Sequence, residues 1–276
     1  MTGSSHPKAL LTFVRNALGK VRDPAGPTAL SVAVSGGADS MALLHCCILL
    51  REQLQLQLLA VAVDHGLRPE AQAEVRQVAE FCGARAVDFV ACRLQLPAGG
   101  NVHARAREAR YRALWASAHA KLGAAAFLAT AHHKDDRAET VLLRLLRGTS
   151  LEGLSVLPPQ TERLLRPLSM ARRADVELHV ARHHIPYVSD PSNADPRYLR
   201  SRVRHELLPL LVELGPGIVE HLTHLADEAQ QLPEPLGLSH EHRQQLRLAL
   251  RDIKRPVDVR LSGGLRLVRA PETDPK

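Results

Sequence analysis

Residues 30–40 read L-S-V-A-V-S-G-G-A-D-S, an apolar run followed by two glycines and a polar turn. The run has the length of a buried strand, and the apolar residues from Met41 onward are typical of a helix, so the stretch predicts strand, turn and helix. Glycines let a backbone approach an anion closely, Ser35 and Ser40 add hydroxyl donors, and the helix aims its free N–H groups at the same point. The stretch therefore predicts a phosphate-binding loop.

Asp39 lies in the first turn of the predicted helix, where its carboxylate would repel a bare phosphate. Mg²⁺ removes this conflict, because it usually takes one or two carboxylates and completes its shell with phosphate oxygens and water. The loop has neither a Walker ending nor a dinucleotide-binding glycine pattern. It resembles instead the S-G-G-x-D-S loop of the PP-loop ATPases, which cleave ATP between the α and β phosphates. An ordinary glycine turn with a capped helix is the alternative. The ATP-binding residues expected here are Ser35, Gly36, Gly37, Ala38, Asp39 and Ser40.

The positive charge of the chain is compatible with binding to nucleic acid but does not by itself indicate it. The formal net charge is +7, and the 36 basic residues comprise six lysines and thirty arginines. Arginine suits phosphate and RNA, because its planar fork pairs with phosphate and stacks on bases. A genome of biased base composition would also give an arginine-rich chain, so charge alone leaves both explanations open.

Length and composition set the outer bounds. With 276 residues, 45% of them hydrophobic, the chain can bury one good core and a small second domain. No apolar run reaches the roughly 18 residues of a membrane span and the start lacks an export signal, so we expect a cytoplasmic protein without a membrane partner. The cysteine spacing fits neither zinc, an iron–sulfur cluster nor a disulfide framework, and we expect small buried hydrophobes at Cys46, Cys47, Cys82 and Cys92.

Strand-length apolar runs alternate with helical stretches through the first two thirds of the chain. Such alternation predicts an α/β fold, a doubly wound parallel sheet of five strands covered by helices on both faces. From about residue 172 the pattern becomes mostly helical. We expect a catalytic ATP-binding domain over residues 1–212 and a small, mainly helical C-terminal domain over residues 213–276. The five strands are expected at residues 30–34, 58–63, 86–90, 126–130 and 163–168.

Chemically active side chains follow several of these predicted strands. In a doubly wound sheet the ligand crevice lies outside the carboxyl ends of the strands, so the groups at those ends should converge. Taken singly, each has a plainer explanation: a charged helix start, a zinc nest, or arginines on a solvated helix face. The groups are Asp64 and His65 after the second strand, His132, Asp136 and Glu139 after the fourth, and Arg107 and Arg110 on one face of the preceding helix.

Together these blocks resemble one branch of the PP-loop proteins, the tRNA(Ile)-lysidine synthetase family. The resemblance runs from residue 30 to residue 209 in the family's order. Three residues depart from the family pattern: His103 replaces Glu, Arg137 replaces Gln and Ser201 replaces Asn. The matching blocks are S-G-G-x-D-S at 35–40, V-D-H-G-L-R at 63–68, N-x-x-A-x-A-R-x-x-R-Y at 101–111, A-T-A-H-H-x-D-D-x-A-E-T at 129–140, L-L-R-L-L-R-G-T at 142–149, R-P-L at 166–168, D-P-S-N at 190–193 and the arginine block at 200–204.

The resemblance implies a carbon–nitrogen ligase that acts on the wobble cytidine of tRNA(Ile) with a CAU anticodon. ATP adenylates the cytidine, and the amine of free L-lysine then displaces AMP to give lysidine. Family members often form homodimers, and only residues 239–271 faintly resemble the family's tRNA-handling region, here in shortened form. The resemblance implies that Asp39 and Asp136 hold Mg²⁺ and that the phosphate loop binds the nucleotide together with Asp64 and His65. It implies that lysine or tRNA is bound by Glu139, Arg200, Arg202 and Arg204. The catalytic residues implied are Asp39, Arg107, Arg110, His132, Asp136 and Glu139.

Two other functions remain open from the sequence. A tRNA thiolase would keep the fold and change the acceptor chemistry, although sulfur transfer usually needs paired catalytic cysteines, and Cys46 and Cys47 lie on a predicted core helix. An inactive ATP- or RNA-binding paralogue is the other, since His103 and the short tail are compatible with lost activity. Asp39, Asp136 and Glu139 argue against that paralogue.

Overall fold

The computed structural model describes residues 9–22, 26–64, 71–94, 102–188, 195–231, 257–260 and 266–269. The chain divides into two compact units, Met1–Gln230 and Gln231–Lys276, which we describe separately. The division expected at residue 212 stays a prediction about domains; the first compact unit extends beyond it. No described helix is long and apolar enough to cross a membrane.

A six-stranded sheet forms the centre of the first unit, in the order β3-β2-β1-β4-β6-β5. Five strands pair in parallel, and the two-residue edge strand β5 runs antiparallel to β6. The expected parallel five-stranded, doubly wound sheet is therefore present, but the expected number of strands is one too low. The strands are β1 (Thr28–Ala33), β2 (Leu56–Asp64), β3 (Asp88–Arg93), β4 (Phe127–Ala129), β5 (Gln160–Thr161) and β6 (Leu164–Leu165).

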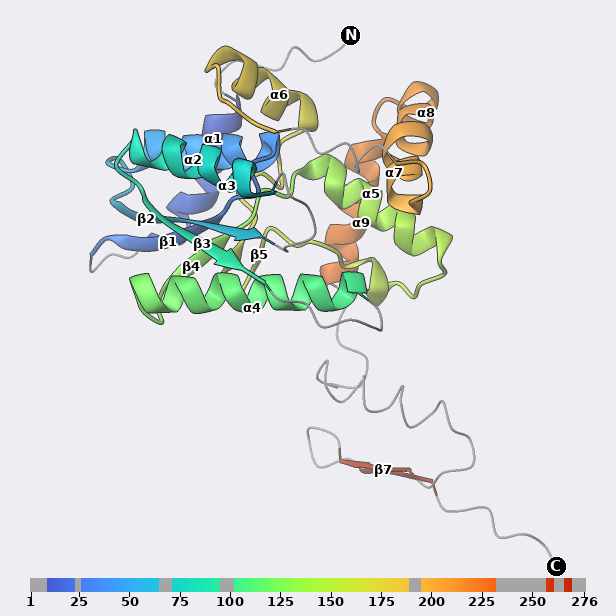
Figure 1. Ribbon diagram of the computed structural model, residues 1–276. Helices are drawn as coiled ribbons and strands as arrows, with labels where there is room; N and C mark the ends of the chain where they lie inside the picture. Colours follow the sequence, from blue (N-terminus) through green and yellow to red (C-terminus); the bar gives the residue numbers. More distant parts are fainter. Residues whose placement is uncertain are drawn as a thin grey trace, which may run out of the picture. The chain divides into compact units, whose positions relative to one another are not determined.

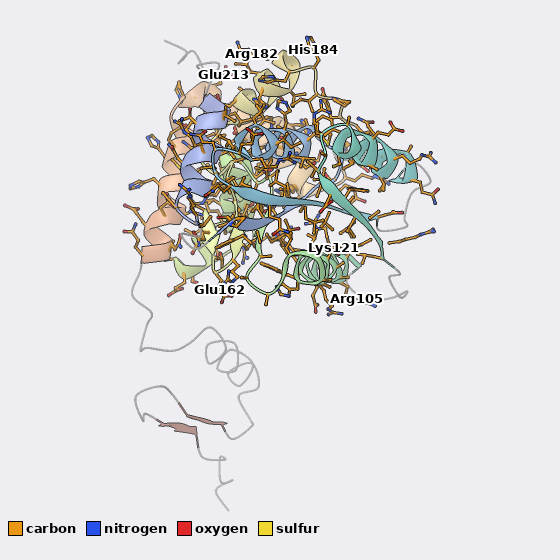
Figure 2. The ribbon with its side chains drawn as sticks, turned by 90° about the vertical axis from the view of Figure 1, so that its left-hand side faces the viewer. Arg105, Lys121, Glu162, Arg182, His184 and Glu213 are labelled. Carbon is orange, nitrogen blue, oxygen red and sulfur yellow. The ribbon has the colours of Figure 1, made fainter. Side chains whose placement is uncertain are left out.

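Helices cover both faces of the sheet, with α4 on one side and α1, α2, α3 and α6 on the other (Figure 1). Arg105 of α4 and Arg182 of α6 lie at opposite edges of this unit (Figure 2). The helices are α1 (Ala9–Gly19), α2 (Ala38–Leu50), α3 (Ala71–Gly83), α4 (Val102–Leu122), α5 (Lys134–Leu146), α6 (Arg173–Arg182), α7 (Leu199–Arg202), α8 (Leu208–Leu214) and α9 (Ile218–Gln231), with a 3-10 turn η1 (Glu152–Leu154) and a π-helical turn η3 (Val203–Leu207).

The sequence of β2 explains why the sheet needs both layers. Successive side chains of a strand point to opposite faces. Leu58 and Ala60 pack with α1, α2, α3 and α6, whereas Leu59 and Val61 pack with Leu114 of α4. An apolar strand without alternating polarity thus fits only a sheet that is buried on both faces.

The strand order creates the crevice at one place. Parallel neighbours β1 and β4 pair at Leu30 with Phe127 and at Val32 with Ala129, so their carboxyl ends lie side by side. The chain proceeds from β1 outward to β2 and β3 and returns to β4 on the other side of β1. The connections after β1 and after β4 therefore lead to strands on opposite sides of this pair, and in such sheets the ligand crevice lies outside the carboxyl ends of the two strands.

Helices α7 to α9 pack on α5 and extend the first unit beyond the sheet (Figure 1). Val141 and Leu142 of α5 share an apolar cluster with Val203, Leu208 and several residues of α9. In the second unit, the described residues form the antiparallel strands β7 (Val257–Arg260) and β8 (Arg266–Arg269). Residues 232–256 of the mainly helical region expected over residues 213–276 lie outside the described residues.

Candidate active site

The loop after β1 has the geometry of an anion cradle. Gly36 has φ +83°, a conformation that side chains other than glycine rarely adopt, and its carbonyl accepts a hydrogen bond from the Val188 N–H at 2.9 Å. The Ser35 N–H donates to Ser40 Oγ at 3.1 Å, and Ser40 Oγ donates to the Gly37 carbonyl at 2.9 Å. No side chain caps α2, so its first N–H groups remain open to an anion. The two serines thus brace the loop in this structure.

A cavity of about 700 Å³ opens beside this loop, at the crevice between β1 and β4. Loops and helices distant in sequence contribute to it, as the clusters after the strands predicted. Of the expected site residues, the cavity is lined by Ser35, Gly37, Asp39, Ser40, Asp64, Arg107, Arg110, His132, Asp136, Arg200 and Arg204.

The start of α5 places Asp136 opposite Asp39. His133 is the N-cap: its Nδ1 accepts from the Asp136 N–H at 3.2 Å, and its own N–H donates to Asp136 Oδ2 at 3.0 Å. This arrangement puts the ring proton on Nε2, which is buried and has no hydrogen-bond partner in the structure. His133 Nε2 lies 3.8 Å from Asp39 Oδ1 and 3.4 Å from Asp136 Oδ2. One imidazole therefore sits between the two carboxylates expected to hold Mg²⁺.

The neighbouring acid, Asp135, binds the residues at the start of α6. Its carboxylate accepts hydrogen bonds from Arg172 Nη2 at 3.1 Å and from the Arg173 N–H at 2.8 Å. Asp135 therefore fixes the start of α6 against α5, while Asp136 faces the cavity.

Glu139 lies one turn further along α5, 1% exposed and held by arginines. Arg204 donates to it twice, from Nε at 2.6 Å and from Nη2 at 3.0 Å, and Nη2 also donates to Asp136 Oδ1 at 2.8 Å. Arg200 and Arg173 approach the Glu139 carboxylate at 3.6 and 3.5 Å. Arg204 belongs to the π-helical turn η3, a local irregularity that is frequent at functional sites.

Burial and neighbouring charges set the protonation states in the cavity. Burial raises the pKa of Asp39, and Asp136 adds to the shift although His133 opposes it. Burial would also raise the pKa of Asp136, but His133, a backbone hydrogen bond and Arg204 outweigh burial, and the pKa is lowered. The pKa of His132 is lowered to about 4, mainly by burial. Its ring is therefore neutral at pH 7, with Nδ1 at 3.0 Å from Thr130 Oγ1.

The donor set fits a magnesium ion. Asp39 and Asp136 are two carboxylates on different helices, and their mutual repulsion is only partly offset by His133. Carboxylate oxygens are hard ligands, and two of them are the usual protein contribution to a site whose other ligands are phosphate and water. Within the described ranges no group of three or more His, Cys, Asp or Glu residues would hold a metal without such help.

Several expected site residues lie elsewhere or outside the described residues. Arg202 does not line the cavity and pairs with Glu206 at 3.0 Å, both side chains being more than half exposed. The side chains of His65 and His103 fall outside the described part of the chain. Arg137, one of the departures, is 3% exposed and pairs with Asp227 of α9 at 2.6 Å, so it contributes to packing between helices.

Sequence reasoning missed four residues of the site region. His133 had a local signal, because it stands three positions before Asp136, the spacing of a capping box. Tyr111 follows Arg110 in the block at 101–111 and lines the cavity. Arg166 belongs to the R-P-L block at 166–168, but that block did not indicate a place beside α4. Arg173 had no local signal, since only the fold brings it beside α5.

The fold and the loop define a class of protein, the PP-loop domains. A family profile described as the PP-loop domain matches residues 10–211. Among solved structures, the U34-tRNA thiolase NcsA from Methanococcus maripaludis has a TM-score of 0.67 at 20% identity, covering 82% of this chain and 80% of that one. An NMN synthetase from Francisella tularensis has a TM-score of 0.54 at 9% identity, covering 84% and 99%. At these identities the likeness concerns the fold alone.

Curated relatives identify the family within this class to which the chain belongs. A tRNA(Ile)-lysidine synthase from Thermobifida fusca is 43% identical over 242 residues, which are 84% of this chain and 72% of that protein. The chain therefore belongs to the tRNA(Ile)-lysidine synthase family. Enzymes of the same name from Ralstonia nicotianae and Pseudomonas aeruginosa are 40% and 37% identical over 78% and 75% of this chain. The chain spans 47% of the length of each of these two, about half.

Proposed function

We propose that the chain is an ATP-dependent ligase that adenylates the wobble cytidine of tRNA(Ile) and joins free L-lysine to it. The observation that carries the proposal is a single cavity that brings together a phosphate loop, two facing carboxylates and a cluster of arginines. Family membership supports the reaction type. A homodimer and the domain division at residue 212 stay predictions.

The first step needs an aligned attacking oxygen and neutralised phosphates. The cytidine oxygen at ring position 2 attacks the α-phosphorus, and the bond to pyrophosphate breaks. The open N–H groups of α2, the cradle at Gly36 and Gly37, and Arg107 and Arg110 on the facing wall bind and orient the phosphates. Mg²⁺ held by Asp39 and Asp136 would neutralise phosphate charge there.

The second step needs a lysine amine that has lost its proton. The amine attacks the activated ring carbon, AMP leaves and one proton passes to a base. Asp136 lines the cavity, is ionised and accepts one hydrogen bond from Arg204, whereas Glu139 does not line the cavity and accepts two. We therefore assign to Asp136 the binding of the amine in this second step, in addition to the Mg²⁺ role proposed for it in the first, and we assign to Glu139 the positioning of Arg204. His132, neutral at pH 7, is a second acceptor on the same wall.

The thiolase alternative has little support from the cysteines. None of the four lines the cavity, and burial raises the pKa of the Cys47 thiol to about 12 and that of Cys82 to about 11. Sulfur chemistry requires a thiolate, so protonated core thiols are poor candidates.

The test is pyrophosphate release from ATP with a tRNA(Ile) transcript that carries the CAU anticodon, followed by incorporation of labelled lysine. A transcript with uridine at the wobble position is the matched control. We expect pyrophosphate release and lysine incorporation with cytidine and neither with uridine. Pyrophosphate release without lysine incorporation would indicate another nucleophile, and the absence of both signals would favour a protein that only binds ATP or RNA.

A further inference from the structure

The aromatic ring of Tyr111 on the cavity wall is in cation–π contact with two arginines of the cavity. Tyr111 of α4 lines the cavity and packs, partly buried, against the apolar cluster of Leu59, Val61, Leu114 and Leu128. The guanidinium carbon of Arg107 lies 5.3 Å from the centre of the ring, and that of Arg110 lies 5.7 Å from it. Both distances are within the range in which a cation is attracted to a ring face. A ring that is fixed to the sheet thus holds two side chains that are otherwise long and mobile.

Among the described residues, the guanidiniums of Arg107 and Arg110 on this wall, and that of Arg166 behind it, have no carboxylate partner. Burial lowers the pKa of Arg110, and the charge of Arg107 lowers it further although Tyr111 opposes the shift. Burial and Arg107 lower the pKa of Arg166 in the same way. Three crowded guanidiniums that form no ion pair within the described ranges favour an anion, because an anion would relieve their repulsion.

One further polar atom beside these guanidiniums is left without a partner. Arg166 Nε is buried and meets no hydrogen-bond geometry within the described part of the chain, although Arg166 lies close enough to the Tyr111 hydroxyl to interact with it. Arg166 is 6% exposed and donates to the Pro158 carbonyl through Nη1 at 2.6 Å. Buried polar atoms are rarely left unsatisfied, so this wall is incompletely satisfied without a ligand.

We propose that Tyr111 is a positioning residue, whose ring holds Arg107 and Arg110 toward the phosphate groups of ATP across the cavity from the loop. The proposal rests on the proposed function for the identity of the nucleotide. A long arginine side chain loses rotamer entropy when it is fixed, so a guanidinium that is already placed loses less freedom when phosphate binds. The ring acts through the arginines and does not itself contact the reacting atoms.

The test compares three variants by calorimetric titration with ATP and Mg²⁺, together with the unfolding midpoint. Tyr111→Leu removes the ring, Tyr111→Phe keeps the ring without the hydroxyl, and Trp115→Leu removes a neighbouring ring that packs on the same cluster without a cation above it. We expect Tyr111→Leu to weaken ATP binding roughly tenfold, Tyr111→Phe to retain most of the affinity, and Trp115→Leu to lower only the unfolding midpoint.

Two outcomes would overturn the proposal. Equal loss of ATP affinity in Tyr111→Leu and Trp115→Leu would mean that the ring only supports packing. Equal loss in Tyr111→Leu and Tyr111→Phe would assign the effect to the hydroxyl. The titration contains neither tRNA nor lysine, so a wild-type protein that binds ATP without modifying tRNA would contradict the proposed function and leave this test intact.

Discussion

Two groups of buried polar side chains in the first unit have opposite characters. At the cavity, Asp136, Glu139 and Arg204 are charged and joined by hydrogen bonds of 2.6 to 3.0 Å. Between α2 and α6, His45 and His179 are hydrogen-bonded at 3.0 Å, and burial lowers the pKa of each to about 4. The first group borders the cavity, and the second packs with apolar core residues.

The difference teaches which buried polar groups indicate function. The histidines stay neutral, so the fold buries them without an ion and nothing about them requires a ligand. The cavity group keeps ions under burial, and Asp39 remains incompletely compensated beside it. Buried charges are costly unless paired, so an unbalanced charge that faces a cavity is a strong indication of a ligand site.

The largest expected effect comes from Asp39. We expect Asp39→Ala to reduce pyrophosphate release by on the order of a thousandfold, because one of two carboxylates for Mg²⁺ is lost. The unfolding midpoint should not fall, since the pKa of Asp39 is raised and its removal relieves Asp136 of a like charge. Steady-state assays and thermal unfolding measure both, with Asp39→Asn as the isosteric control. Normal turnover of either variant would contradict the metal role.

The histidine group should affect stability and leave activity alone. His45 and His179 have a folded-state pKa of about 4, below the ordinary value, so the unfolded chain binds more protons between about pH 6.5 and 4. Stability that is present above pH 6.5 is therefore lost as the pH falls toward 4. We expect His179→Gln to flatten this dependence of the unfolding midpoint, with unchanged pyrophosphate release at pH 7.5.

Exposed His224 on α9 provides the matched control for the histidine prediction. His224→Gln should leave the pH dependence as in the unsubstituted chain. If His179→Gln reduced turnover while His224→Gln did not, the buried histidines would be coupled to the cavity residues. The distinction between a structural histidine group and a functional cavity group would then be wrong.

The smallest effect is expected at Arg202, whose exposed pair with Glu206 should contribute little to stability. If Arg202 contacts tRNA phosphate, Arg202→Ala should raise the KM for tRNA a few-fold and reduce its salt dependence by about one unit of slope, with the KM for ATP unchanged. Arg112→Ala, which breaks a similar exposed pair with Glu108, is the control. Identical tRNA kinetics in both variants would remove Arg202 from the interface.

Much of the fold was predictable because it depends on local patterns. The apolar runs of β1, β2 and β4 are strongly periodic or continuous, and their alternation with helices leaves few topologies. The edge strand β5 was missed because Gln160 and Thr161 carry no apolar pattern and pair only because β6 lies beside them. The packing of α9 on α5 was likewise hidden, since it depends on contacts between distant segments.

The sequence by itself determined the phosphate loop, the family and the set of acids and bases, because glycine turns, strand ends and ordered motifs are written in consecutive residues. Only the tertiary structure decided how those residues are used. It separated Asp136, which faces the cavity, from Asp135, which anchors α6, and it placed Arg204 rather than Arg202 on Glu139. These assignments depend on distance and burial, which chain order does not specify, because side chains adjacent in sequence point in different directions on a helix.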